Sequence, residues 1–194
     1  MNFNKAEFET SFAESEKLPE SDLPEVVFCG KSNVGKSSLL NRLLQRKNLA
    51  YVSATPGKTA TINFFKVDGV RFVDLPGYGY AKVSKAKKEA WAELMEGYFQ
   101  MGRDILLVVL LIDMRHPPSR DDLAMAEYLI EYEFPFVVAL TKCDKLSKTE
   151  RIERRAALCS ELPNFDEITS VELSSATGEG IDMLKGIISE VCED

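Results

Sequence analysis

The sequence has little of what disulfide-rich, membrane-spanning or secreted proteins need. Its 4 cysteines lie far apart with no CxxC pair, which indicates reduced thiols and argues against a disulfide framework or a zinc site. The longest apolar run, residues 105–112, is too short to cross a bilayer. No basic-then-apolar leader opens the chain, so we expect no secretory signal and a cytoplasmic location.

Positive charge is also in short supply. Lys and Arg number 24 against 31 Asp and Glu, which gives a net charge of -7. This balance argues against broad coating of nucleic acid, although it is compatible with a local basic face. We therefore expect neither a DNA nor a membrane partner. The single histidine, His116, lies in a proline-rich loop and is interpreted as a solvated side chain rather than a catalytic base.

The rest of the composition is that of one globular domain. The chain has 194 residues, of which 45% are hydrophobic and 28% charged. Residues 1–24 are predicted to form an N-terminal extension, and residues 25–194 a single domain. Short apolar runs then alternate with amphipathic stretches. The runs predict strands at residues 26–29, 61–67, 70–74, 106–112, 136–140 and 170–173. The amphipathic stretches predict helices at residues 37–45, 85–100, 121–132, 149–159 and 181–191.

This alternation predicts a three-layer α/β fold. The sheet should be mainly parallel and six-stranded, with one antiparallel edge strand supplied by a hairpin around Asp68 and Gly69. In such a sheet, ligands bind at the carboxyl ends of the strands. Each motif below falls at one of those ends.

The first motif is a phosphate-binding loop. Residues 30–37 read GKSNVGKS, which matches G-x-x-x-x-G-K-[ST] between a predicted strand and a predicted helix. Glycines let the backbone N–H groups curl around phosphate oxygens, and the helix N-terminus adds positive potential. Lys36 would reach the β- and γ-phosphates, and the Ser37 hydroxyl would ligate Mg²⁺. The alternative is a strand–helix turn that matches by chance.

The second motif is D-x-x-G at residues 74–77, directly after an apolar strand. In phosphoryl-transfer proteins the Asp of this motif holds a Mg²⁺ water, and the Gly N–H contacts the γ-phosphate. A polar loop at residues 55–61 precedes it, where GTPases place a threonine on Mg²⁺. We assign this role to Thr59, with Thr61 as the alternative. Lys36, Thr59 and Gly77 are thus the candidate catalytic residues.

The third motif selects the base. Residues 141–144 read TKCD, a variant of N-K-x-D. The Asp144 carboxylate can accept two hydrogen bonds from guanine, whereas adenine would leave it unpaired. Thr141 replaces the usual Asn, so the bonds of that Asn must be shortened or lost. Residues 174–176 follow the last strand, where a backbone N–H could contact guanine O6.

Taken together, these residues resemble the EngB (YihA/YsxC) family of bacterial ribosome-biogenesis GTP-binding proteins. The resemblance runs from about Phe8 to Val191 and includes the PEVVF, TPGKT, NFF and DLPGYGYA segments outside the phosphate loop. It implies a P-loop GTPase fold, bound GTP or GDP, and Mg²⁺ held by Ser37 and Thr59. It also implies action on the large ribosomal subunit or its assembly intermediate, through rRNA and protein, and a link to septation and cell division. The implied nucleotide contacts are Gly30, Lys31, Ser32, Asn33, Val34, Gly35, Lys36, Ser37, Ser38, Gly57, Lys58, Thr59, Ala60, Thr61, Asp74, Leu75, Pro76, Gly77, Thr141, Lys142, Cys143, Asp144, Ser174, Ser175 and Ala176.

Two hypotheses concern hydrolysis. Tyr78 stands where many small GTPases have the Gln that orients water, so unassisted turnover should be slow. Asn33 lies where, in GTPases with this local pattern, an Asn helps to seat K⁺ beside the phosphates. The competing functions are a metabolic kinase or ATPase that uses the same loop, and a non-hydrolysing binding module in which the nucleotide only holds the fold.

A last hypothesis concerns the partner surface. Tyr78 and Tyr80 offer stacking faces, and a basic cluster follows them at Lys82, Lys85, Lys87 and Lys88. This segment would face ribosomal RNA and change with the nucleotide state. The alternative is a solvated helix face. We expect the protein to be a monomer.

Overall fold

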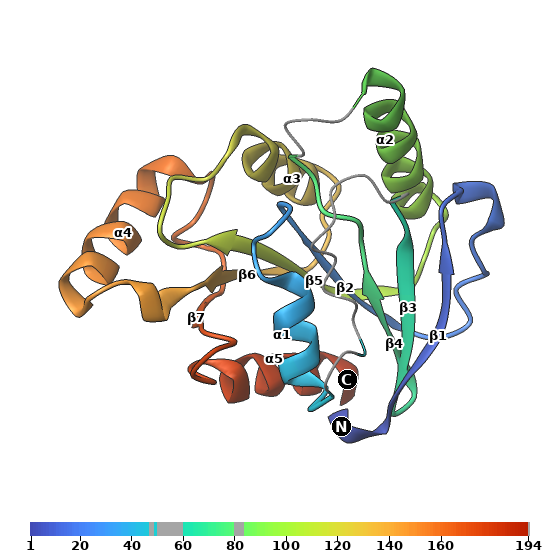
Figure 1. Cartoon of the computed structure of the whole chain (residues 1–194), viewed down its shortest axis with the longest axis horizontal. Coiled ribbons are helices and arrows are strands. Elements are labelled where there is room, and N and C mark those ends of the chain that lie inside the picture. Colours follow the sequence, from blue (N-terminus) through green and yellow to red (C-terminus); the bar gives the residue numbers. More distant parts are fainter. Residues whose placement is uncertain (47–48, 50–59, 80–83, 194) are drawn as a thin grey trace.

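The computed structural model describes residues 1–46, 49, 60–79 and 84–193 (Figure 1). Within them, a seven-stranded sheet runs through the molecule. Its strands, in spatial order, are β1 (Ala6–Phe12), β3 (Ile62–Val67), β4 (Val70–Asp74), β2 (Glu25–Gly30), β5 (Ile105–Asp113), β6 (Phe136–Thr141) and β7 (Ser170–Leu173). From β4 to β7 all neighbours are parallel, whereas the β1–β3 and β3–β4 pairs are antiparallel.

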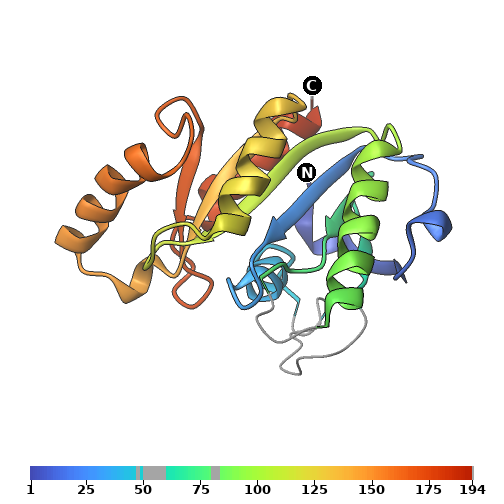
Figure 2. The same ribbon diagram turned by 90° about the horizontal axis from the view of Figure 1, so that it is seen from above.

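Helices cover both faces of the sheet, which confirms the three-layer α/β fold (Figures 1 and 2). One face packs against α1 (Lys36–Leu43) and α5 (Ile181–Glu193). The other packs against α2 (Lys85–Gln100), α3 (Arg120–Glu131) and α4 (Lys148–Glu161). Strand β2 is buried along its whole length, as a strand covered on both faces must be. Among the described residues no helix is long and apolar enough to cross a membrane.

The expected strand count of six is wrong, because the segment assigned to an N-terminal extension contributes β1 to the sheet edge. Its sequence, AEFETSF, alternates apolar and polar residues with the period of a half-buried strand. Phe8 packs edge-on against Phe65 at 5.7 Å between ring centroids, and Phe12 against Phe64 at 6.1 Å. This edge therefore holds two antiparallel strand pairs, β1–β3 and β3–β4, and the reversed strand β3 is not the outermost one.

The hairpin between β3 and β4 is confirmed. Asp68 and Gly69 adopt φ values of 48° and 94°. Positive φ at both central residues gives the turn whose twist matches two antiparallel strands. The turn returns the chain along β4. Asp74, the last residue of β4, therefore lies at the same end of the sheet as Gly30, the last residue of β2.

A buried ionic cluster lies at the opposite end of the central strands. Glu25, at the start of β2, is 0% exposed and accepts hydrogen bonds from Arg103 Nε at 2.8 Å and Nη2 at 2.7 Å. The Tyr98 hydroxyl of α2 donates to the same carboxylate at 2.6 Å. Nearby, Arg71 of β4 is 2% exposed and forms a bidentate pair with Glu9 of β1. The cluster therefore connects the edge strand, the central strands and α2.

This cluster predicts a large loss of stability when Glu25 is removed. Glu25→Ala leaves the Arg103 guanidinium buried without its carboxylate, and we expect the free energy of unfolding to fall by about 3–5 kcal/mol. Urea denaturation followed by circular dichroism measures the change. Glu14→Ala is the control, because its pair with Lys17 lies in solvent and its loss should not move the midpoint. Equal midpoints for both variants would contradict the role of the cluster.

Candidate nucleotide-binding site

The phosphate-binding loop connects the end of β2 to the start of α1. Gly35 is the N-cap of α1 and has a φ of 107°, a conformation that favours glycine. Because the N-cap residue is glycine, it has no side chain to cap the helix. At Gly30 an added Cβ would lie 2.9 Å from the Leu111 carbonyl oxygen of β5. Both glycines of the motif are therefore required by backbone conformation or by close packing.

Lys36 and Asp74 bring the first two motifs together. The Lys36 ammonium forms an ion pair with the Asp74 carboxylate, and the two side chains are only 11% and 7% exposed. Asn63 of β3 donates from Nδ2 to the other Asp74 oxygen at 3.4 Å, and Thr61 contacts Asn63 at 3.3 Å. The candidate residues Gly57, Lys58 and Thr59 lie outside the described residues. Of the two threonines considered for Mg²⁺, only Thr61 can therefore be placed.

Backbone hydrogen bonds join the D-x-x-G loop to the phosphate-binding loop. Ser32 N–H donates to the Tyr78 carbonyl oxygen at 2.8 Å, and Tyr78 N–H donates to the Gly30 carbonyl at 3.4 Å. A Cβ at Gly77 would lie 3.1 Å from both the amide nitrogen and the Cα of Ser32. A side chain would therefore crowd the Ser32 backbone, and Gly77 lies directly against the phosphate-binding loop.

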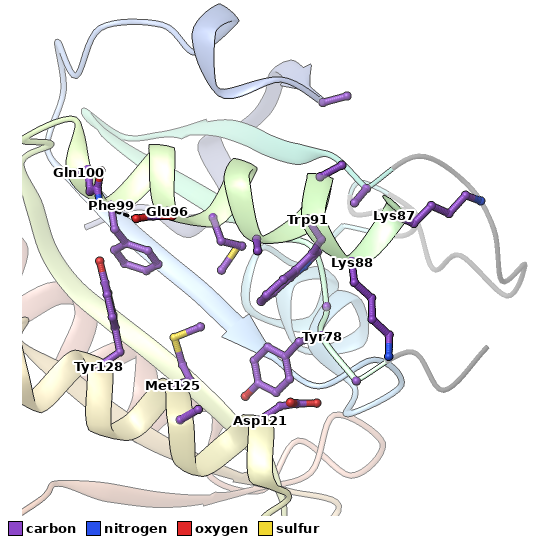
Figure 3. A pocket seen from close by; sticks show the side chains of 18 of the residues that line it. Tyr78, Lys87, Lys88, Trp91, Glu96, Phe99, Gln100, Asp121, Met125 and Tyr128 are labelled. Carbon is purple, nitrogen blue, oxygen red and sulfur yellow. Dashed lines mark hydrogen bonds between the residues drawn. The ribbon is translucent and has the colours of Figure 1, made fainter. Parts of the chain in front are cut away.

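The Tyr78 side chain points into the protein, contrary to the hypothesis that it offers a stacking face to RNA (Figure 3). The residue is 4% exposed, and its hydroxyl donates to Asp122 of α3 at 2.7 Å. Its ring packs edge-on against Trp91 of α2, whose indole N–H donates to the Pro76 carbonyl at 3.1 Å. Burial raises the pKa of Tyr78 well above its ordinary value, so the phenol stays protonated. Tyr80 and Lys82 lie outside the described residues.

Thr141, at the end of β6, replaces the usual Asn, whose bonds we expected to be shortened or lost. Thr141 nevertheless forms a hydrogen bond to the phosphate-binding loop. Its hydroxyl lies 2.8 Å from the Val34 carbonyl oxygen in the phosphate-binding loop and 3.3 Å from the Ile112 carbonyl. Thr141 is 4% exposed, so water does not compete for these contacts. A short hydroxyl thus joins the base-selecting strand to the phosphate-binding loop directly.

Lys142 adds a second connection between these loops. It has a φ of 62°, and its ammonium donates to the Asn33 carbonyl at 2.8 Å and to Asp113 at 2.9 Å. Asp113 also accepts hydrogen bonds from Arg115 at 2.9 and 2.8 Å. Burial alone would raise the pKa of Asp113, but the hydrogen bonds from Arg115 and Lys142 outweigh it and hold the pKa well below its usual value. The Asp113 carboxylate is therefore charged and fixes Lys142 in place.

Asp144 and the loop at residues 174–176 lie together, as the motifs require. A hydrogen bond from the Ser174 side chain is the main reason that the pKa of Asp144 lies below its ordinary value. The Asp144 side chain is 15% exposed, so an ionised acceptor is available at the surface of the site. Ser174 is buried, and its carbonyl accepts from Gly178 N–H at 2.8 Å, which closes the loop.

The cysteines near the site are packing residues, in agreement with their interpretation from the sequence. Burial raises the pKa of Cys29 to about 12 and that of Cys143 to about 11, so neither is a thiolate near neutral pH. His116 is exposed, also as expected.

Four residues with structural roles at the site were missed in the sequence: Trp91, Asp113, Arg115 and Asp122. Only Asp122 had a local signal, because Ser119 and Asp122 form a helix capping box at the start of α3. Arg115 acts on Asp113 two residues away, in a pairing with no recognised motif, whereas the contacts of Asp113 with Lys142 and of Trp91 with Tyr78 join distant segments.

Comparison with known proteins agrees with this geometry. A family model described as 50S ribosome-binding GTPase matches residues 25–142. A probable GTP-binding protein EngB from Exiguobacterium sibiricum is 49% identical over 94% of this chain and 95% of its own length. One from Chlorobaculum tepidum is 49% identical over 95% of each chain.

Solved structures give the same fold. A probable GTP-binding protein engB superposes with a TM-score of 0.70 at 24% identity, covering 87% of this chain and 98% of that one. The G domain of the T. maritima FeoB iron transporter has a TM-score of 0.54 at 30% identity, over 87% of this chain and 98% of that domain.

The fold and the motif loops at the carboxyl ends of its strands define a P-loop GTPase. Near-complete coverage by relatives that share almost half of its residues narrows the class further. The chain belongs to the EngB family of GTP-binding proteins.

The Thr141 contact predicts a specific loss. Thr141→Val removes the hydroxyl and leaves the Val34 carbonyl without this donor, which should lower the free energy of unfolding of the nucleotide-free protein by about 1–3 kcal/mol. The affinity for GDP should fall as well, because the two loops lose their alignment. Thr141→Ser keeps the hydroxyl and serves as the control. Titration with a fluorescent GDP and urea denaturation measure both effects, and a Val variant that matches the Ser variant in both would disprove the role.

Proposed function

We propose that GTP or GDP binds along the carboxyl ends of the strands, where the motif loops at residues 30–37, 74–77, 141–144 and 174–176 lie. The phosphates would contact residues 30–38 and 57–61, the D-x-x-G loop at 74–77 would contact the γ-phosphate, and residues 141–144 and 174–176 would hold guanine. The observation that carries this proposal is the pair of contacts from Thr141 and Lys142 to the phosphate-binding loop, at 2.8 Å each. They place the base-selecting segment directly beside the phosphate-binding segment.

The donor set also fits Mg²⁺. Ser37 lies in the first turn of α1, which follows β2, and Asp74 ends β4, the strand beside β2; their hydroxyl and carboxylate oxygens are ligands that suit this cation. Ser37 and Thr59 would coordinate it together with phosphate oxygens, and Asp74 would hold one of its waters. When bound, Mg²⁺ would neutralise charge on the β- and γ-phosphates.

Lys36 is proposed to exchange partners when nucleotide arrives. In the described structure its ammonium is paired with Asp74. A phosphate oxygen would replace that carboxylate, and Asp74 would turn to the metal. Gly77 N–H and Thr59 would then stabilise the γ-phosphate during hydrolysis. Tyr78 cannot orient the attacking water in this arrangement, because its hydroxyl is held by buried Asp122.

Slow unassisted hydrolysis follows. We expect single-turnover hydrolysis at roughly 10⁻⁴ to 10⁻² s⁻¹, the range of GTPases without an activating group. A purified protein that turns over several times per second would contradict this expectation. Complete absence of hydrolysis would favour the non-hydrolysing binding module.

A bound monovalent cation would supply part of the positive charge that an activating group provides beside the phosphates. Asn33 adopts a φ of 64° in the phosphate-binding loop, with its carbonyl fixed by Lys142. We propose that its side chain helps to seat K⁺ beside the phosphates. The same hydrolysis assay should then run faster in KCl than in NaCl at equal ionic strength, and Asn33→Ala should remove the difference. Equal rates of the unmodified protein in both salts would reject the K⁺ site.

We further propose that the protein is a cytoplasmic monomer that acts on the large ribosomal subunit or its assembly intermediate, with a link to septation. The description of the matching family, 50S ribosome-binding GTPase, supports a ribosomal partner. The direct test is co-sedimentation with purified large subunits in the GTP-analogue, GDP and empty states. Binding that depends on the nucleotide supports a switch. Absence of binding in all three states overturns the proposal.

A basic helix start supports contact with an anionic partner. Lys85, Lys87 and Lys88 occupy the first turn of α2, which has no acidic residue. Positive charge at a helix N-terminus opposes the helix dipole, so these lysines do not favour the helix itself. Lys85 is 91% exposed and lies 3.6 Å from Glu89, an ion pair that solvent weakens. We propose that exposed lysines of this helix start, Lys85 among them, contact ribosomal RNA.

This contact predicts a change in salt dependence. Lys85→Gln should weaken binding to large subunits and reduce the slope of log affinity against log salt by about 0.7–0.9, the value for one phosphate contact. The affinity for GTP should not change. Lys148→Gln is the matched control, because Lys148 also begins an exposed helix, α4. If both variants keep the slope of the unmodified protein, the basic cluster is a solvated face.

A further inference from the structure

A wide groove lies between α2 and α3, beside the D-x-x-G loop (Figure 3). Its volume is about 810 Å³. Contacts connect the two sides of the groove at both of its ends, at one of them through Tyr78, which precedes α2 and packs against Trp91. At one end the Tyr78 hydroxyl bonds to Asp122, and at the other the Phe99 and Tyr128 rings pack at 5.4 Å between centroids. The side chains that line the open part are mainly apolar and include Trp91, Met95, Phe99, Met125 and Tyr128.

The length of the groove suits a helix. Its lining residues on α2 extend from Lys87 to Gln100, a rise of about 20 Å. A third helix of about three and a half turns would fit along two helices that already lie side by side, as Figure 2 shows for α2 and α3. Such a helix would place apolar residues at i, i+3, i+4 and i+7 in the groove.

The charged side chains at the two ends of the groove favour one orientation of a bound helix. At the end near the nucleotide site, the groove is lined by two lysines, Lys87 and Lys88, and one acid, Asp121. The Lys31 side chain also lies near this end, because its Cε would be 3.1 Å from a Cβ placed on Gly79. In Figure 3 the Lys88 side chain turns toward this end of the groove. At the far end stands Glu96, bonded to Gln100 at 2.8 Å. The negative C-terminus of a helix therefore suits the Lys88 end, and its positive N-terminus the Glu96 end.

The lining favours protein over RNA. Met125 is partly exposed and offers flexible apolar surface, which binds apolar side chains well but would leave the sugar and phosphate groups of RNA without partners. Trp91 and Phe99 already pack against Tyr78 and Tyr128 respectively. We propose that this groove binds an amphipathic helix of a protein in the large subunit or its assembly intermediate, with the acidic or C-terminal end of that helix at Lys88. This inference rests on the proposed function.

The groove can report the nucleotide state because Gly77, Tyr78 and Gly79 line it. The backbone of Tyr78 is bonded to Ser32 and Gly30 of the phosphate-binding loop. A change at the γ-phosphate position thus moves one wall of the groove. The helix would bind one nucleotide state more tightly than the other, and by reciprocity it would shift the affinity of the protein for GTP relative to GDP.

The first test places a charge in the groove without touching the nucleotide site. Ala124 of α3 lines the groove and is exposed, so Ala124→Glu should fold normally. It should weaken binding to purified large subunits at least about tenfold, because a carboxylate would face the apolar side of the bound helix. Ala156→Glu, at an exposed position of α4, is the matched control and should bind normally. GDP affinity and melting temperature should be unchanged in both variants.

The second test identifies the occupant. Ala124→p-benzoyl-L-phenylalanine, irradiated in the bound particle, should give a cross-link to a ribosomal or assembly protein that protease removes and ribonuclease does not. A cross-link to rRNA or to a second copy of this chain, or no cross-link in a bound particle, overturns the inference. So does normal binding by Ala124→Glu. If the unmodified protein binds no subunit in any nucleotide state, the proposed function itself fails.

Discussion

The hydrogen bond from Ser32 N–H to the Tyr78 carbonyl, at 2.8 Å, is the contact on which the arrangement of the site depends. It holds the D-x-x-G loop against the phosphate-binding loop so closely that a Cβ at position 77 would press on the Ser32 backbone. The same contact directs the Tyr78 side chain away from the site and toward Asp122. In the proposed function, a phosphate group bound at Ser32 would act on Gly77 and Tyr78 together. The same backbone contact links the phosphate-binding loop to the wall of the α2–α3 groove that Gly77 and Tyr78 line.

Fixed charges set the electrostatics around this contact. Lys36 and Asp74 neutralise one another at one side of the loop, and Lys142 and Asp113 do so at the other. Each lysine therefore has a carboxylate partner in the described structure and need not be desolvated alone. In the proposed function, phosphate oxygens would take over Lys36, and Asp74 would then hold a water of the bound Mg²⁺. Lys142 differs, since Asp113 is also held by Arg115 and the pair has a structural role. One lysine is thus available for exchange, and the other maintains the site.

The sequence predicted the parts of the fold that follow from local pattern. The bounds of α2, β4 and β7 agree with the expected ranges, because apolar periodicity and flanking turns define them. Strand β1 was missed because its polar face and its position before Pro19 resembled a solvated extension. Gly30, Gly35 and Thr141 fell where the motifs required. The Tyr78 orientation was wrongly predicted, because an aromatic residue between two glycines looks exposed until its distant partners, Trp91 and Asp122, are known.

The roles of Thr141 and Asp113 explain why a variant base-selecting motif can work. A longer Asn side chain is unnecessary where β6 brings Thr141 Oγ1 within 2.8 Å of the Val34 carbonyl. The register of β5 and β6 places Asp113 opposite Thr141, so the charge that fixes Lys142 comes from the neighbouring strand. The phosphate-binding loop is thus held from the base side by one neutral and one charged contact. If residues 141–144 hold guanine as proposed, a base that displaces Asp144 would also disturb the segment that fixes Asn33 and Val34, and the base and phosphate sites would be coupled.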